Sequence, residues 1–197
     1  SGSQFHERRE CIHLGANDTE SLSTALSPRP RGRGKRDSFA NQYGIAAETG
    51  RRAGVVVAPV IPYGMALHHM AFPGTISLRP STLLRVVYDV LASLSRHGFR
   101  RVLILNGHGG NTSSLKAGVA EANDVHNTLL IKTLPWWELP SVLTVLKEAF
   151  GDRDGAHGTA GETSLVMALN PGIVSEEPAE MTPLKGGNVW PHASRWA

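Results

Sequence analysis

The segment at residues 102–111, which reads Val-Leu-Ile-Leu-Asn-Gly-His-Gly-Gly-Asn, constrains the fold more than any other part of this sequence. Its four leading apolar residues suit a buried strand and are too few for a helix before the glycines intervene. From Thr112 onward, a helical pattern places Leu115 and Ala122 on one face. His108 is therefore predicted on a turn from a strand to a helix, which is where open α/β sheets bind ligands.

Helical and strand patterns alternate along most of the chain. Helices are predicted near residues 37–50, 80–97, 112–123, 141–150 and 159–169, and strands at 55–61, 101–106 and 128–132. Strands separated by helices of this length form a parallel sheet with right-handed crossovers. The predicted fold class is α/β, a three-layer α/β/α sandwich with a mainly parallel central sheet.

The composition favours a single globular domain over residues 37–197. The chain has 197 residues, of which 41% are hydrophobic, enough for one core. Residues 1–36 show no helical or strand periodicity and are predicted to be irregular. Within them, the basic, proline-bearing tract 27–36 has the composition of a linker. The small net charge of +3 comes largely from that tract, so the rest of the chain is close to neutral. The tract has no interleaved aromatic residue that could stack on bases. Nucleic acid is therefore not a predicted partner, and RNA binding by the tract is the weaker alternative.

The remaining composition indicates a cytoplasmic protein with no membrane partner. Cys11 is the single cysteine, which excludes an internal disulfide and fits a reducing compartment. No apolar run approaches the roughly 20 residues that a membrane-spanning helix needs.

Two residues can be argued on their sequence context alone. Glycines on both sides of His108 favour close approach by a ligand, although a histidine that only shapes the turn is the more common case. Glu162 fits a capping box with Thr159, yet it also lies on the apolar stripe of its helix, where a carboxylate is costly unless it is paired or binds a metal. These alternatives stay open on sequence pattern.

Three motifs resemble those of the creatininase (creatinine amidohydrolase) family. They are Asn-Gly-His-Gly-Gly-Asn at 106–111, Phe-Pro-Gly-Thr-Ile-Ser-Leu at 72–78, and His157 followed by Gly-Glu-Thr-Ser at 161–164. The resemblance implies a creatininase-like fold and a metal-dependent amidohydrolase that cleaves a non-peptide C–N bond of a small molecule through a metal-activated water. It also implies one or two divalent ions, zinc or manganese with iron as a further option, and a homo-oligomer, by resemblance a hexamer.

The same resemblance suggests roles for individual residues. His108 is expected to bind the metal, and Glu162 to bind it and take part in catalysis. His157 is expected to act as a catalytic acid or base. Substrate binding is assigned to a further set near these motifs: His69, Trp137, Gly109, Gly110 and Asn111. His68 is the weaker candidate of the histidine pair.

The N-terminal part departs from the family pattern. The family's Glu-Gln-His-Gly segment, which supplies further metal ligands, is not intact here. Only short stretches around His6 and His13 partly match it. Asp18 and Asp37 compete for the role of the metal-bridging aspartate, and we prefer Asp37. Creatinine-hydrolysing members also carry a glutamate two residues after the turn histidine, whereas this chain has Gly110, which argues against creatinine as the substrate.

Three functions therefore remain. The first is a metal-dependent amidohydrolase. The second is a degenerate, non-catalytic relative that has lost ligands, and the third is a peptidase-like relative acting on a small modified peptide.

Overall fold

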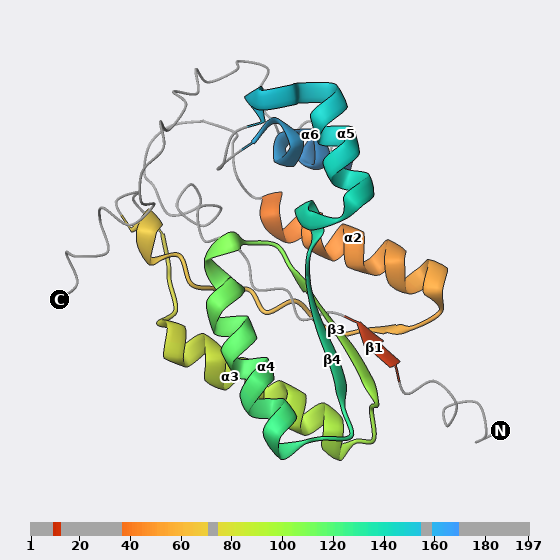
Figure 1. The fold of residues 1–197 in the computed structure, drawn as a ribbon, viewed down its shortest axis with the longest axis vertical. Coiled ribbons are helices and arrows are strands. Elements are labelled where there is room, and N and C mark those ends of the chain that lie inside the picture. Colours follow the sequence, from red (N-terminus) through yellow and green to blue (C-terminus); the bar gives the residue numbers. More distant parts are fainter. Residues whose placement is uncertain (1–9, 13–36, 71–74, 155–158, 170–197) are drawn as a thin grey trace.

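The computed structural model describes residues 10–12, 37–70, 75–154 and 159–169 (Figure 1). The strands are β1 (Glu10–Ile12), β2 (Val56–Val57), β3 (Arg101–Asn106) and β4 (Leu130–Pro135). The α-helices are α2 (Asp37–Ala53), α3 (Pro80–Arg96), α4 (Thr112–Val125), α5 (Pro140–Phe150) and α6 (Ala160–Leu169). Short 3-10 turns include η1 (Leu67–His69), η2 (Gly109–Asn111), η3 (Trp136–Glu138) and η4 (Gly151–Arg153).

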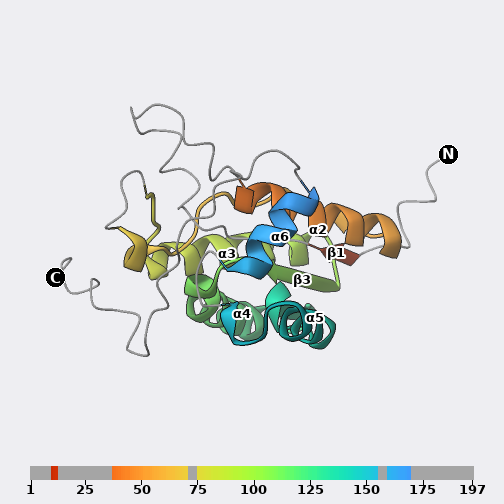
Figure 2. The same cartoon turned by 90° about the horizontal axis from the view of Figure 1, so that it is seen from above.

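The four described strands form one sheet in the order β2-β1-β3-β4, and every neighbouring pair is parallel. The chain moves from β1 to β2 in one direction and then returns across β1 to β3 and β4. Right-handed crossovers then require α2 on one face and both α3 and α4 on the other. Figures 1 and 2 show this arrangement, with α3 beside α4 and α2 on the opposite side of the sheet. The predicted three-layer α/β fold is confirmed.

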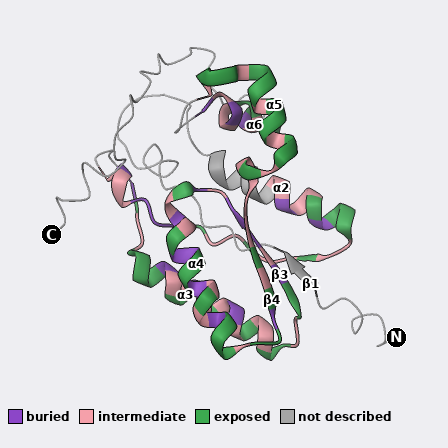
Figure 3. Cartoon of the chain, in the orientation of Figure 1, coloured by how far each residue is buried: buried purple, intermediate pink, exposed green. Residues whose placement is uncertain are grey.

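The main core lies between β3 and the helix pair α3 and α4. Leu83, Val87 and Leu91 of α3 are fully buried against Ile104 of β3 and Leu115 of α4. Figure 3 shows buried segments, in purple, along α3, α4 and β3. Leu115 lies on the apolar face predicted for the helix that begins at Thr112. Burial of these side chains stabilises the layer that positions the loops at the end of β3.

The N-terminal strand corrects one prediction. Residues 1–36 were predicted to be irregular, but Glu10–Ile12 forms β1, which pairs with β2 on one side and β3 on the other. Three residues are too few to show the alternation of apolar and polar residues that marks a strand. Glu10–Ile12 is a strand because it pairs with a neighbouring strand on each side. The other residues of 1–36 lie outside the described ranges, and the domain boundary at residue 36 stays a prediction.

Two strand boundaries also differ from their predictions. The strand predicted at 55–61 is only Val56–Val57, since Pro59 has no N–H to donate to a neighbouring strand. The strand predicted at 128–132 begins at Leu130 and continues to Pro135, in register with β3. Within the described ranges, none of the helices is both long and apolar enough to cross a membrane.

Candidate metal centre

His108 lies where the sheet offers its natural binding crevice. After β1 the chain crosses to α2 on one face, whereas after the neighbouring β3 it crosses to α4 on the other. Ligands bind between the carboxyl ends of two strands whose connections diverge in this way. His108 lies two residues after the end of β3, at this edge of the sheet, so the topology confirms that it lies on a turn from a strand to a helix.

Hydrogen bonds inside the turn hold His108 in place. The side-chain oxygen of Asn106 accepts the backbone N–H of His108 at 3.2 Å and the side-chain N–H of Asn111 at 3.3 Å. The backbone N–H of Asn111 then donates to the carbonyl of His108 at 3.1 Å. Both asparagines are buried, and their amides supply the partners that a buried turn needs.

A second loop brings two more histidines to the same place. The side-chain oxygen of Asn111 accepts the backbone N–H of Met65 at 2.8 Å, which fixes the segment leading into η1. The backbone N–H of His69 donates to Ala66 at 2.9 Å, and the hydroxyl of Thr75 donates to the carbonyl of His69 at 3.0 Å. The loop that carries His68 and His69 is therefore tied both to the His108 turn and to itself.

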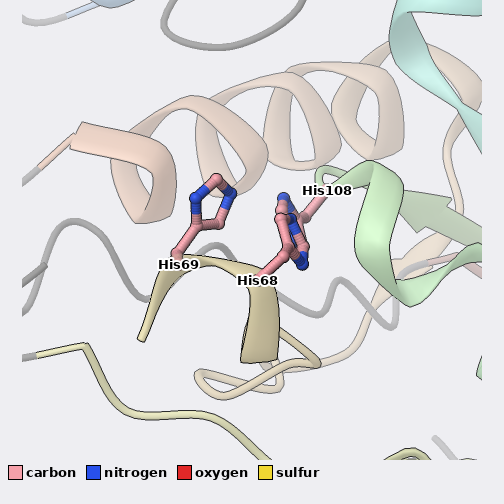
Figure 4. A group of neighbouring side chains, drawn as sticks. All are labelled: His68, His69 and His108. Carbon is pink, nitrogen blue, oxygen red and sulfur yellow. The ribbon is translucent and has the colours of Figure 1, made fainter. Parts of the chain in front are cut away.

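The three imidazoles of His68, His69 and His108 form a compact group, which we call the histidine cluster (Figure 4). The rings of His68 and His108 stack at 5.3 Å between centroids with planes 4° apart, and those of His68 and His69 lie 4.0 Å apart. One nitrogen from each ring lies within 4.8 Å of the other two. His69 and His108 are buried and His68 is partly buried. Neutral imidazole is the commonest protein ligand for a transition metal, so this donor set fits a divalent ion.

Gly110 leaves the space in which the cluster packs. A Cβ atom at this position would lie 2.5 Å from Nε2 of His108, 2.5 Å from the carbonyl oxygen of Met65 and 2.8 Å from Cε1 of His68. These distances are shorter than carbon atoms tolerate, and the Met65 oxygen belongs to the backbone. A side chain at residue 110 is therefore incompatible with this arrangement of rings, whereas Gly109 faces open space.

Glu162 forms the capping box that its sequence suggests. Its carboxylate accepts the backbone N–H of Thr159 at 2.9 Å, and its own N–H donates to the Thr159 hydroxyl at 3.1 Å. These bonds use one carboxylate oxygen, and Glu162 has a further interaction as well. Glu162 is not a member of the histidine cluster, and its roles in metal binding and catalysis stay predictions.

Other predicted site residues fall outside what the structure describes. His157 lies outside the described ranges, as do His6, His13 and Asp18. Asp37 begins α2, but the position of its side chain is not among the described features. The predicted metal and catalytic roles of this group are therefore untested.

The predicted substrate-binding residues lie around the same edge of the sheet. Asn106 of β3 pairs in register with Pro135 of β4, and His108 and Trp137 each follow two residues later. Trp137 is partly buried and meets Trp136 edge to face at 6.0 Å. Asn111 is fully buried, and its amide bonds to Asn106 and Met65, which gives it a positioning role. Contact of these residues with a substrate stays a prediction.

The structure places His68 in the histidine cluster, although the sequence analysis ranked it below His69. Its ring stacks on His108 more directly than that of His69. A signal was available in two adjacent histidines placed shortly before the Phe-Pro-Gly-Thr turn. The local sequence does not specify that η1 turns the rings of His68 and His69 toward the turn of His108, which lies about forty residues later in the chain.

Known proteins match most of this chain. The family Creatininase, creatinine amidohydrolase, matches residues 37–197. Creatinine amidohydrolase from Pseudomonas putida is 32% identical over 144 residues, which cover 66% of this chain and 55% of that protein. Mycofactocin precursor peptide peptidase from Mycolicibacterium smegmatis is 37% identical over 79 residues, covering 40% of this chain and 30% of that protein.

Solved structures agree with these sequence matches. A manganese creatininase superposes with a TM-score of 0.70 at 25% identity, covering 97% of this chain and 78% of that one. This chain spans only 55% of the Pseudomonas putida enzyme, about half of its length. Because the family match covers most of the chain, and the fold and the His108 turn agree with it, this protein belongs to the creatininase family.

Proposed function

We propose that this protein is a metal-dependent amidohydrolase that cleaves a C–N bond in a small molecule. The observation that carries the proposal is the histidine cluster at the crevice beside the carboxyl end of β3. Three imidazoles brought together there by hydrogen-bonded loops suit a divalent ion better than they suit a structural core. The relatives named creatinine amidohydrolase and manganese creatininase support the same reading.

The residues of this chain have distinct tasks in the proposed reaction. A divalent ion, when bound, supplies Lewis acidity and lowers the pKa of a water molecule so that hydroxide forms near neutral pH. His108 would hold the ion, with Glu162 and Asp37 as predicted further ligands and zinc, manganese or iron as the predicted metals. Asn106 and Asn111 orient the turn that presents His108.

Proton transfer and substrate contact are assigned to groups around this turn. His157 is the predicted acid that protonates the leaving nitrogen, because a histidine titrates near neutral pH. Trp137 would pack on the substrate, and Gly109 would let the substrate approach the backbone. Creatinine itself is not the proposed substrate, since Gly110 stands where creatinine-hydrolysing members carry a glutamate.

A peptide substrate is the second candidate. The specific observation in its favour is the 37% identity with the mycofactocin precursor peptide peptidase, which exceeds the 32% with the creatinine amidohydrolase over a shorter match. A small modified peptide offers the same amide bond to the same metal-activated water, so both candidates share one mechanism. The degenerate, non-catalytic relative is the outcome expected if the purified protein holds no metal.

We also propose that the protein acts in the cytoplasm as a homo-oligomer, by resemblance a hexamer, with small-molecule substrate as its partner. Light scattering at micromolar concentration tests the assembly, and a monomer would contradict it.

The function is tested by elemental analysis followed by assay. The purified protein should contain zinc, manganese or iron, and prolonged dialysis against a chelator should remove both the metal and the hydrolysis of an amide panel. The panel should include creatinine, linear and cyclic amides, and short peptides. Return of activity on adding back one metal supports the proposal, whereas activity that survives complete metal removal contradicts it.

A further inference from the structure

We propose that the groove between α3 and the end of α4 is a second binding site, which takes a small zwitterion with a carboxylate at one end and an ammonium group at the other. The groove holds about 610 Å³, a volume within the range of roughly 300–1,000 Å³ that is typical of small-molecule sites. The lining side chains that carry the argument are Tyr88, Asp89, Ser93, Arg96 and His126.

The groove lies at the opposite end of the sheet from His108. α3 ends at Arg96 and leads into β3, and His126 follows α4 and leads into β4. The groove therefore lies beside the amino ends of these two parallel strands, where Figure 1 shows the last turns of α3 and α4. His108 lies beyond the carboxyl end of β3, whose six residues span roughly 20 Å. A small ligand in the groove is out of reach of the histidine cluster.

His126 provides the observation that points to a ligand. Its Nε2 atom is buried and has no hydrogen-bond partner among the described residues. Buried polar atoms of this kind are rare, because leaving them unpaired costs stability. The backbone of His126 is fixed, since its N–H donates to Ala122 at 2.7 Å and its carbonyl accepts the N–H of Leu129 at 3.0 Å. The imidazole lines the groove, so rotation about its side-chain bonds brings Nε2 to a molecule bound there.

The charges of Asp89 and Arg96 set the chemistry of the ligand. These residues are seven positions apart on α3, so they lie on one face of the helix and about 10 Å apart along its axis. Among the residues that the structure describes, neither charged group has an ion pair or a side-chain hydrogen bond. The guanidinium suits a carboxylate and the Asp89 carboxylate suits an ammonium group. A ligand with a single charge satisfies one of these groups and leaves the other without a partner.

The space between the two charges suits an apolar chain. The rings of Tyr88 and His126 lie 6.0 Å apart between centroids, and both residues are partly buried, so they form an apolar wall of the groove. The hydroxyl of Ser93 donates to the backbone carbonyl of Asp89 at 2.7 Å, which leaves the Asp89 carboxylate to the ligand. A molecule whose charges are several bonds apart therefore fits the groove better than an α-amino acid.

The inference is tested on the purified protein with ε-aminocaproate, whose two charged groups are joined by a chain of methylene groups. Calorimetry should show binding with a Kd near roughly 1 mM, as expected for so small a ligand. Caproate and hexylamine, which each carry one charge, should bind at least about tenfold more weakly. Absence of ε-aminocaproate binding, or equal binding of either single-charge compound, would overturn the inference.

Proton NMR locates the bound molecule. The ring resonances of His126, assigned by their loss in His126→Phe, should shift as ε-aminocaproate is added. His126→Phe keeps an aromatic ring and removes both nitrogens, so it should also weaken binding. Saturable binding that leaves the His126 resonances unmoved would place the ligand elsewhere and contradict the inference.

Variants of the exposed charges complete the test. Asp89→Asn and Arg96→Gln should each weaken ε-aminocaproate binding roughly tenfold or more, because each removes one charge-assisted hydrogen bond. Asp124→Asn and Lys116→Gln are the matched controls, since both residues are exposed on α4 and neither lines the groove. They should keep wild-type affinity. Equal losses in the controls would mean that binding follows overall charge, and the inference would then be wrong.

The outcome is independent of the proposed function. Asp89→Asn and Arg96→Gln should keep wild-type metal content and amide hydrolysis, because the groove is remote from the histidine cluster. A protein that holds no metal and still binds ε-aminocaproate through these residues would refute the metal-dependent enzyme and support the second site.

Discussion

The side-chain oxygen of Asn111 accepts the backbone N–H of Met65 at 2.8 Å and so joins two loops that lie 46 residues apart in the sequence. One loop carries His108 and the other carries His68 and His69. Asn111 is fully buried and also bonds to Asn106 through its side-chain nitrogen. The histidine cluster therefore depends on a residue that contributes no metal-binding atom to it.

Asn111→Leu should damage both stability and metal binding. Leucine has a similar size but leaves the Met65 N–H without this partner, which costs about 1–3 kcal/mol for a buried group left unsatisfied. The Asn106 oxygen keeps the N–H of His108 as a donor. The free energy of unfolding, measured by urea denaturation, should fall, and zinc affinity should fall with it. Asn127→Leu at an exposed position is the control. Unchanged zinc affinity in folded Asn111→Leu would show that the two loops meet without this bond.

Gly110→Ala should displace the imidazoles, whereas Gly109→Ala should not. The added methyl group at residue 110 would lie 2.5 Å from both Nε2 of His108 and the backbone oxygen of Met65, and the second contact can be relieved only by moving the loop. We expect overpacking to cost about 1–3 kcal/mol in the free energy of unfolding. Zinc content by mass spectrometry should also fall. At Gly109 a methyl group meets nothing within 4 Å, so equal effects of the two variants would contradict this account.

The sequence predicted those parts of the fold whose signals are local. The apolar run before Asn106, the glycines after it and the helical pattern from Thr112 lie next to one another, so they specify the β3 turn and the position of His108 without help from distant residues. The inner face of α4 was likewise readable, because Leu115 and Ala122 repeat at the helical period and both are buried. The crevice beside His108 forms because the chain leaves β1 toward one face of the sheet and leaves the neighbouring β3 toward the other.

The parts that were missed depend on contacts distant in sequence. β1 has three residues, Glu10–Ile12, and is a strand because β2 and β3 pair with it on both sides. The position of His68 beside His108 depends on η1 and on the Asn111 bond to Met65, neither of which is visible in the residues around it. Glu162 shows the reverse case, since its capping box was predicted correctly and yet does not decide whether it also binds metal.

Leu83→Ala should destabilise the layer beneath the site. Leu83 is fully buried between α3 and the rest of the core, and large-to-small changes of this kind cost about 2–5 kcal/mol. The midpoint of urea denaturation should fall accordingly. Leu143→Ala in α5 is the control, because Leu143 is 51% exposed and its loss should cost much less. Similar losses in both variants would argue against the core described here.

Glu162→Gln separates the capping role of Glu162 from its predicted metal and catalytic roles. Glutamine can still accept the Thr159 N–H through its amide oxygen, so the free energy of unfolding should change by less than about 1 kcal/mol. It cannot supply the anionic oxygen that a metal prefers, so metal content or amide hydrolysis should fall.

The control for Glu162→Gln is Thr159→Ala, which removes the hydroxyl that accepts the Glu162 N–H. That change should cost about 0.5–2 kcal/mol in the free energy of unfolding, the usual range for a lost N-terminal cap, without loss of metal. Metal content is measured by mass spectrometry and hydrolysis with the amide panel. If Glu162→Gln leaves both at the wild-type level, Glu162 is only a helix cap, and the predicted carboxylate ligand must be sought elsewhere in the chain. Loss of metal in Glu162→Gln with full retention in Thr159→Ala would instead make Glu162 a ligand in addition to a cap.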